Sequence, residues 1–203
     1  MINSKQDMKY YIEADMKSLE VYPVTWKTRV FSWVCPVEWK YQEKLRKIEY
    51  RLNCRRRNVV EKLIYKIKFC MFLRYGVKLG CYIPPNVFGP GLCLRHAGTV
   101  IVNSHVRAGS NCRIHAGVNI GNSSPNGEEW QADNTPVIGN NVYIGPGAKL
   151  FGKIHIGDGV AIGANAVVNK DVPPNVTVAG VPAKIINEKG SAAVFLIHGD
   201  ETV

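Results

Sequence analysis

The histidines are the main candidates for acid–base or metal chemistry in this chain. Four of the five histidines lie between residues 96 and 155, namely His96, His105, His115 and His155. An imidazole is largely neutral near pH 7 and can both accept and donate a proton, so it suits general-base catalysis. Three imidazoles converging on one metal ion would instead bind zinc. His115 follows His96 by nineteen positions.

The cysteines indicate a reducing compartment. The six of them show no CxxC pair or other metal-ligand spacing: Cys35, Cys54, Cys70, Cys81, Cys93 and Cys112. We therefore expect reduced thiols in the cytoplasm and no disulfide framework. The polar start MINSKQDMKYY does not resemble a signal peptide. No run of eighteen apolar residues occurs, so no membrane span is expected.

The element that must position these side chains is a six-residue repeat. An aliphatic residue recurs every six positions at Ile138, Ile144, Leu150, Ile156, Ile162 and Val168. Glycine follows most of these aliphatics, and a small or branched residue comes four places on. This period predicts a parallel β-helix in which three hexapeptides form one triangular coil of eighteen residues. The aliphatic residue points inward, and the glycine lets the chain turn a corner.

An earlier set of residues extends the six-residue spacing toward the N-terminus. It comprises Tyr82, Phe88, Leu94, Val100, Val106, Cys112 and Val118. The solenoid should therefore start near residue 81. Because Val118 and Ile138 are twenty positions apart, the register is expected to break once, at the insertion GNSSPNGEEWQADNTP (residues 121–136). A long loop leaving a regular coil is usually functional or disordered, and we favour function.

The pattern of residues 1–80 predicts a small helical region that caps one open end of the solenoid. The first helix is capped by Ser4 or Asp7, and its apolar face is Met8, Tyr11, Ile12, Met16 and Leu19. The second follows Pro36 with a Glu43–Lys47 pair, and its apolar face is Val37, Tyr41, Leu45, Ile48 and Leu52. The third opens on an Asn58–Glu61 capping box and closes at Gly76. Its predicted apolar face is Val60, Leu63, Ile64, Ile67 and Met71.

The net charge of +10 belongs to this N-terminal part. Residues 1–80 carry eighteen Lys and Arg against eight Asp and Glu, whereas residues 81–203 carry eight against eight. This excess suits an anionic partner such as a lipid headgroup, a nucleotide or an acidic sugar, or it forms solvated helix faces. A loop over residues 22–39 adds Trp26, Trp33 and Trp39, which pack on the helices or sit at a membrane interface.

Residues 81–187 resemble a known family. The run LRHAGTVIV, the hexapeptide blocks and IGANAVVNKDVPPNVTVAGVPAKII look like the acetyl-CoA-dependent hexapeptide acyltransferases. The closest branch is the serine O-acetyltransferases and their relatives in surface-polysaccharide loci. The resemblance implies a left-handed β-helix, acetyl-CoA as co-substrate, no metal, and a homotrimer with active sites in clefts between neighbouring coils. Residues 188–203 form a tail of unassigned role.

The resemblance also assigns roles to individual residues. His96 matches the catalytic general base, which takes the proton of an acceptor hydroxyl and passes it to the CoA thiolate. Pro146 and Ala164 match positions whose backbone lines the pantetheine groove. The matches to the nucleotide-phosphate contacts are Asn169, Lys170 and Lys184.

The acceptor site departs from the serine acetyltransferase pattern. Cys81 stands where an aspartate orients the histidine, and Arg95 replaces an aspartate of the serine site. Asn134 and Thr135 replace the Arg-His pair that recognises the serine carboxylate. These changes favour an uncharged polyol over serine. Glu128, Glu129 or Asp133 of the insertion would then replace the missing orienting carboxylate. His115 should stack near His96 as a polar neighbour.

The sequence thus predicts a mainly β fold and an acetyl-CoA-dependent O-acetyltransferase of a surface-polysaccharide sugar or its lipid-linked precursor. It would be cytoplasmic, at the inner face of the membrane through its basic N-terminal part, with no nucleic-acid partner. Serine acetylation is the alternative within the class. A zinc-dependent β-helix protein of the carbonic-anhydrase kind is the alternative outside it, although no histidine pair has that family's spacing.

Overall fold

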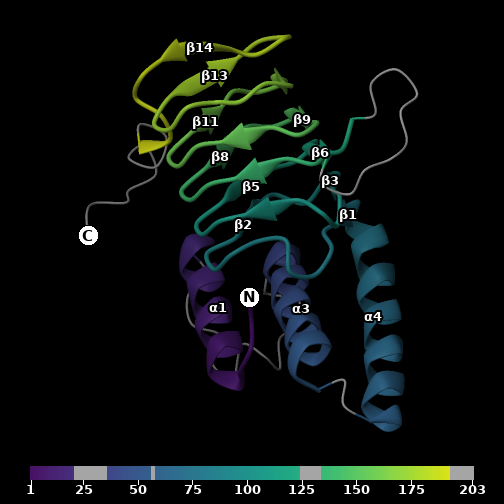
Figure 1. Ribbon diagram of the computed structural model, residues 1–203. Helices are drawn as coiled ribbons and strands as arrows, with labels where there is room; N and C mark the ends of the chain where they lie inside the picture. Colours follow the sequence, from purple (N-terminus) through teal and green to yellow (C-terminus); the bar gives the residue numbers. More distant parts are fainter. Residues whose placement is uncertain (21–35, 56–57, 124–133, 193–203) are drawn as a thin grey trace.

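The computed structural model describes residues 1–20, 36–55, 58–123 and 134–192. Helices α1 (Lys5–Ser18), α3 (Val37–Tyr50) and α4 (Val59–Leu79) come first, with a π-helical turn η1 (Arg51–Arg55) before α4. They gather at one end of a column of short strands, and the later strands of the chain lie progressively farther from them (Figure 1). The strands form a left-handed parallel β-helix, as the repeat and the resemblance together predict.

The described strands form three sheets, one for each face of the prism. The first sheet contains β1 (Cys81–Tyr82), β3 (Val100–Val102), β6 (Asn119–Gly121), β9 (Lys149–Phe151) and β12 (Val167–Val168). The second contains β4 (Arg107–Ala108), β7 (Val137–Ile138) and β10 (His155–Ile156). The third contains β2 (Cys93–Arg95), β5 (Arg113–His115), β8 (Tyr143–Ile144), β11 (Ala161–Ile162), β13 (Thr177–Ala179) and β14 (Lys184–Asn187). All pairs are parallel except β13 with β14.

Strand pairing corrects the predicted register. Ile144 pairs with Ile162, eighteen positions on, whereas Ile114 pairs with Ile144, thirty positions on. The coil that contains the insertion is therefore longer by twelve residues, which is a multiple of six. The frame therefore does not break at residues 121–136, contrary to expectation; the two-residue shift lies in the first coil instead, where Leu94 pairs with Ile114, twenty positions on. Val118 lies four places after Ile114 and so holds the position of the small or branched residue, whereas Ile114 is the counterpart of the later aliphatic Ile144.

The same pairing corrects the start of the column. Cys81 pairs with Val100, and Tyr82 with Ile101, so Tyr82 points outward and is 51% exposed. Beyond it, the predicted inward residues are buried as expected, from Phe88 to Val168. The predicted role of the corner glycines holds at Gly145, where a β-carbon would lie 2.7 Å from the carbonyl oxygen of Ile162. A side chain there would push adjacent coils apart.

The helices keep their predicted caps but not all of their predicted faces. The Ser4 side chain accepts from the Asp7 N–H, the Asn58 side chain accepts from the Glu61 N–H, and Lys47 pairs with Glu43 at 2.6 Å. Helix α1 buries Asp15 together with Tyr11. In α3, Tyr41, Leu45 and Ile48 are buried as expected, while Val37 is exposed and Leu52 lies beyond the helix in η1.

Helix α4 departs further from expectation. Gly76 does not close it, because the helix continues to Leu79 and is capped by Gly80 at a φ of 72°. Gly76 faces the solenoid, where a β-carbon would lie 2.5 Å from the Cys81 carbonyl oxygen. The buried side of the helix is the one that carries Phe72, not the predicted aliphatic stripe. The stripe is exposed at Val60, Leu63, Ile67 and Met71.

The tryptophan segment lies largely outside the described residues, since Trp26 and Trp33 fall within 21–35. Trp39 is described, and it corrects the expected loop. It belongs to α3, just inside its start, and is 5% exposed. It therefore packs inside the molecule. No helix in the described part of the chain is long and apolar enough to cross a membrane.

Side chains of α1 and α3 hydrogen-bond the open edge of the first coil. Gln42 donates to the Leu92 carbonyl and accepts from the Leu94 N–H, at 2.6 and 2.9 Å, as a neighbouring strand would. Asp15 accepts from the N–H groups of Gly91 and Leu92. Further along, the Tyr41 hydroxyl accepts from the N–H of Ile83, and Glu49 accepts from the N–H of Asn86. The buried edge is thus satisfied without another strand.

Arg46 holds this cap together. Its guanidinium is fully buried, pairs with Asp15 at 2.8 Å and with Glu49 at 3.0 Å, and lies 4.9 Å from the Tyr11 ring centroid. It also donates to the carbonyls of Phe88 and Gly89. Burial raises the pKa of both carboxyls, and the guanidinium opposes that rise. One side chain therefore ties two helices to the solenoid.

We expect Arg46→Ala to destabilise the protein by about 3–5 kcal/mol, because two buried carboxylates would lose their cation. Urea unfolding followed by circular dichroism measures the difference. Lys47→Ala is the matched control, since it removes an exposed pair on the same helix and should cost at most about 1 kcal/mol. Equal losses in the two variants would contradict the assignment of Arg46 as the centre of the cap.

Candidate active site

One edge of the prism gathers several of the predicted site residues. We call it the His96 edge: the corners that follow the third-sheet strands β2, β5, β8 and β11. The corners stack through backbone hydrogen bonds, from Gly117 N to Thr99 O, Gly147 N to Ala116 O, and Asn165 N to Pro146 O, at 2.6–2.9 Å. Residues far apart in the sequence thus share one continuous edge.

His96 begins this edge at the helical end of the solenoid. It directly follows β2 and is exposed. Its φ of 74° lies in the left-handed region, where the other described non-glycine residues are Glu20 and five asparagines. Histidine is uncommon in this region, and backbone strain of this kind concentrates at functional sites. The corner therefore presents an imidazole to solvent from a strained turn.

Two more rings continue from His96 along the edge. The His115 ring centroid lies 6.2 Å from that of His96, and the Tyr143 centroid lies 5.1 Å from that of His115. His115 is thus close to His96, as predicted, but the rings are tilted by 56° instead of stacked face to face. No sequence motif marks Tyr143 as a site residue. Only the thirty-residue coil that joins β5 to β8 brings it there.

Arg95 lies beside a carboxylate that the sequence did not indicate. Its guanidinium is 3.6 Å from the Glu20 carboxylate, just after α1. Arg95 pairs in register with His115 on the next coil. The N-terminal helices therefore contribute a charged group next to the His96 edge. The two residues are 75 positions apart, so no local sequence pattern indicates this contact.

Cys81 is buried beneath the same end of the solenoid. Its thiol donates to the Gly98 carbonyl at 3.3 Å, two residues after His96. Burial raises the pKa of this thiol, and the negative charge of Glu38 adds to the rise. A neutral thiol committed to a backbone carbonyl is neither a strong nucleophile nor a substitute for an orienting carboxylate.

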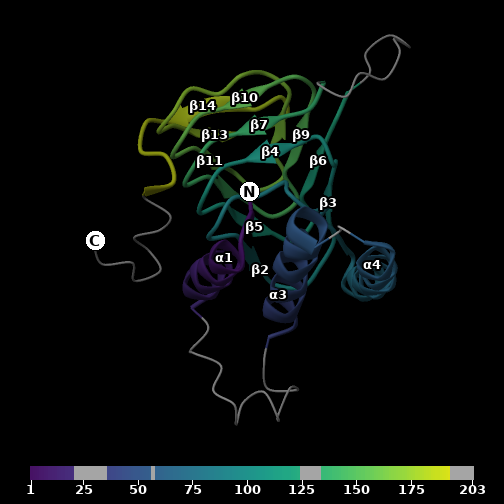
Figure 2. The ribbon, with the colours of Figure 1, turned by 60° about the horizontal axis from the view of Figure 1, so that its bottom comes forward.

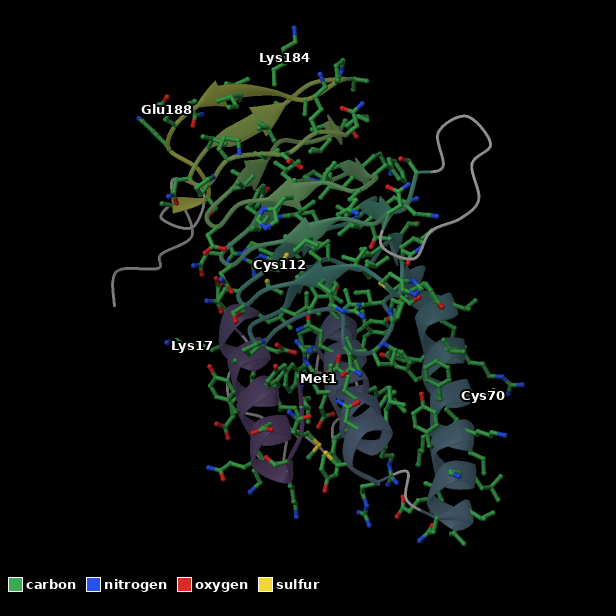
Figure 3. All side chains as sticks on the ribbon, viewed as in Figure 1. Met1, Lys17, Cys70, Cys112, Lys184 and Glu188 are labelled. Carbon is green, nitrogen blue, oxygen red and sulfur yellow. The ribbon has the colours of Figure 1, made fainter. Side chains whose placement is uncertain are left out.

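The residues matched to CoA contacts fall on two edges. Pro146 and Ala164 are exposed on the His96 edge, one coil apart. Asn169 and Lys170 follow β12 and are exposed on a different edge, where the corners follow the first-sheet strands. Lys184 lies on β14 and extends from the far end of the solenoid (Figure 3). A single chain therefore does not place all the residues matched to CoA contacts on one edge.

The ends of the insertion lie on the same edge as Lys170, since the insertion follows β6. The Asn134 side chain donates to the Ser123 carbonyl, and Thr135 is buried. The proposed orienting carboxylates Glu128, Glu129 and Asp133 lie outside the described residues. In one chain, Asn134 and Thr135 are thus on a different edge from His96.

The histidines weighed for zinc lie on different faces. His105 follows β3 at a first-sheet corner, and His155 lies on β10 of the second sheet. Within residues 1–20, 36–55, 58–123 and 134–192, no group of three or more His, Cys, Asp or Glu side chains is placed to hold a metal ion.

Comparisons with known proteins agree with this architecture. The family model described as bacterial transferase hexapeptide (six repeats) matches residues 135–170. A serine acetyltransferase of Helicobacter pylori is 36% identical over 131 residues, which cover 62% of this chain and 74% of that protein. A serine acetyltransferase of Buchnera aphidicola is 39% identical over 105 residues. That match covers 52% of this chain but only 39% of the Buchnera protein.

Among solved structures, serine acetyltransferase from Brucella abortus in complex with coenzyme A superposes with a TM-score of 0.71 at 27% identity. The match covers 92% of this chain and 70% of that one, so it includes the helices as well as the solenoid. These findings confirm the resemblance seen in the sequence, and the chain belongs to the serine acetyltransferase family of hexapeptide-repeat proteins.

Proposed function

We propose that this protein is an acetyl-CoA-dependent O-acetyltransferase with His96 as its general base. The observation that carries the proposal is the shared edge of His96, Pro146 and Ala164. A strained, exposed imidazole stands at one end of a row of exposed corner backbone, along which an extended pantetheine arm could lie. A relative with the same fold was solved in complex with coenzyme A.

The reaction follows from imidazole chemistry. His96 accepts the proton of an acceptor hydroxyl as its oxygen attacks the thioester carbonyl. When the tetrahedral adduct collapses, the C–S bond breaks and the imidazolium returns the proton to the CoA thiolate. A positioned base of this kind is typically worth about 10² to 10⁴ in rate. Direct transfer requires no acyl-cysteine, in keeping with the buried, protonated thiol of Cys81.

The comparisons support serine as the acceptor better than a sugar, because the relatives that match are named serine acetyltransferases. A sugar acceptor is the second candidate on two observations. The family's orienting carboxylate is replaced by Cys81, whose thiol bonds the Gly98 carbonyl. A serine zwitterion also needs a partner for its carboxylate, and Arg95 is already paired with Glu20.

The proposed active assembly is a cytoplasmic homotrimer. Residues matched to one CoA molecule lie on two edges of a single prism. A threefold arrangement with parallel prism axes would set the His96 edge of one subunit against the Lys170 edge of the next. Contact with a membrane through the basic N-terminal region would suit a lipid-linked acceptor.

The first test measures release of free CoA thiol from acetyl-CoA with serine, sugars and nucleotide sugars as acceptors. We expect acceptor-dependent release that falls by about 10² to 10⁴ in His96→Ala. Ser110→Ala is the control, because Ser110 follows β4 on the remaining edge of the prism, outside the proposed cleft, and this variant should stay within about twofold. The preferred acceptor is the one with the highest kcat/KM.

Two outcomes would contradict the proposal. One is full activity in His96→Ala, and the other is acceptor-independent release together with no acetyl-CoA binding by calorimetry. In the second case, zinc content of the purified protein tests the carbonic-anhydrase alternative.

A second test concerns Cys81. We expect Cys81→Ser to keep kcat within about threefold, because the thiol does not react. Iodoacetamide at pH 7.5 should modify the exposed Cys70 well before Cys81, since burial raises the pKa of the Cys81 thiol and only the thiolate is alkylated. Mass spectrometry of tryptic peptides gives both rates. A loss of activity above 100-fold in a folded Cys81→Ser variant would require a chemical role for this thiol.

A further inference from the structure

A basic groove lies between α3 and α4, in the helical part of the molecule, and Met8 of α1 also lines it. Its volume is about 560 Å³. The cationic side chains that line it are Lys44, Lys47, Arg51, Arg55 and Lys68. Its apolar lining includes Ile48 and Phe72, which are buried, and Met71, which is exposed. Such a groove combines an apolar floor with a positively charged rim.

The carboxylates near this rim do not neutralise it. Glu43 pairs with Lys47 at 2.6 Å, and Glu61 pairs with Arg51 and Arg55 at 3.2 and 3.1 Å. Glu38 also lies near enough to act on Tyr75 of the groove, so five cations face three carboxylates, which leaves a local excess of positive charge. An anion entering the groove would meet cationic side chains from two helices.

The exposed side of α4 continues this surface. Val60, Leu63, Ile67 and Met71 recur at helical spacing and are between 52% and 64% exposed. Their side of the helix is opposite to the buried side that carries Phe72. Figure 2 looks nearly along α4 and shows it at the margin of the helical cluster. Met71 belongs to both the stripe and the groove, so the two surfaces are continuous.

Basic residues flank the apolar stripe on the same helix. They are Lys62, Lys66, Lys68, Arg74 and Lys78, all exposed, against the single acid Glu61. An aliphatic stripe bordered by lysines and arginines is the pattern of helices that lie in the interface of an anionic membrane. Their long side chains reach the headgroup phosphates while the apolar side enters the acyl layer.

Charge argues against a second copy of this chain as the occupant. Two α4 helices packed face to face would bring two sets of five cations together. The solenoid offers no acidic excess to receive them, because residues 81–203 carry eight basic and eight acidic residues. An anionic phospholipid surface matches both the apolar stripe and the charge.

We propose that α4 docks on an anionic phospholipid bilayer, with its aliphatic stripe in the interface and phosphate headgroups in the groove between α3 and α4. The helix has 21 residues and is about 30 Å long, so it can lie along the membrane plane over its whole length. This docking does not require acetyl transfer, so it stands or fails independently of the proposed activity.

The test is sedimentation of the full-length protein with vesicles of phosphatidylcholine alone or with 30% phosphatidylglycerol. We expect binding to the anionic vesicles and at least tenfold weaker binding to the neutral ones, because each basic residue near an anionic surface strengthens binding about fivefold. Lys44→Glu/Lys68→Glu should weaken binding at least tenfold. Leu63→Ser/Ile67→Ser should weaken it by a similar factor, since it removes the apolar contact.

Lys5→Glu/Lys9→Glu on α1 is the matched control. It changes the net charge equally but lies outside the groove and the stripe, so binding should stay within about threefold. The proposal is overturned if the protein ignores anionic vesicles, or if the control weakens binding as much as the groove variant. It is also overturned if Leu63→Ser/Ile67→Ser leaves vesicle binding intact but changes the oligomeric state in analytical ultracentrifugation, because the stripe would then be a subunit interface.

Discussion

A parallel β-helix begins with a backbone edge that no strand covers, and the rest of this structure depends on how that edge is satisfied. Buried N–H and C=O groups must find partners. Here the partners are side chains of two helices, among them Gln42, which bonds residues 92 and 94 as a strand would. Because β2 leads directly into His96, the same cap fixes the candidate catalytic corner. Folding of the helical part and placement of the imidazole are therefore coupled.

The period of the solenoid decides which residues can work together. Residues eighteen apart, such as Pro146 and Ala164, stack on one edge, whereas residues six apart, such as Ala164 and Lys170, lie on neighbouring edges. A ligand that contacts both kinds of position must bridge two edges of a convex prism. A groove for such a ligand needs a second prism beside the first, which is the physical argument for the proposed trimer.

The sequence predicts the β-helix well, because one aliphatic residue per hexapeptide is a local signal. It also predicts the caps at Ser4 and Asn58, which depend on the next few residues. What it could not predict depends on distant pairing. The frame before the insertion cannot be assigned from the sequence, because both inward positions of each hexapeptide are apolar, as Ile114 and Val118 are. The Arg95–Glu20 contact and Tyr143 beside His115 arise only when coils stack.

Helix α4 shows why an apolar stripe does not by itself identify a buried face. The helix has two apolar sides, one aromatic, including Phe69 and Phe72, and one aliphatic, including Leu63 and Ile67. Only one side can face the solenoid, and the close approach at Gly76 requires the aromatic one, since Gly76 lies one turn from Phe72. The aliphatic side then has no place inside this chain. Keeping it in water has a hydrophobic cost, so its presence points to a contact outside the chain.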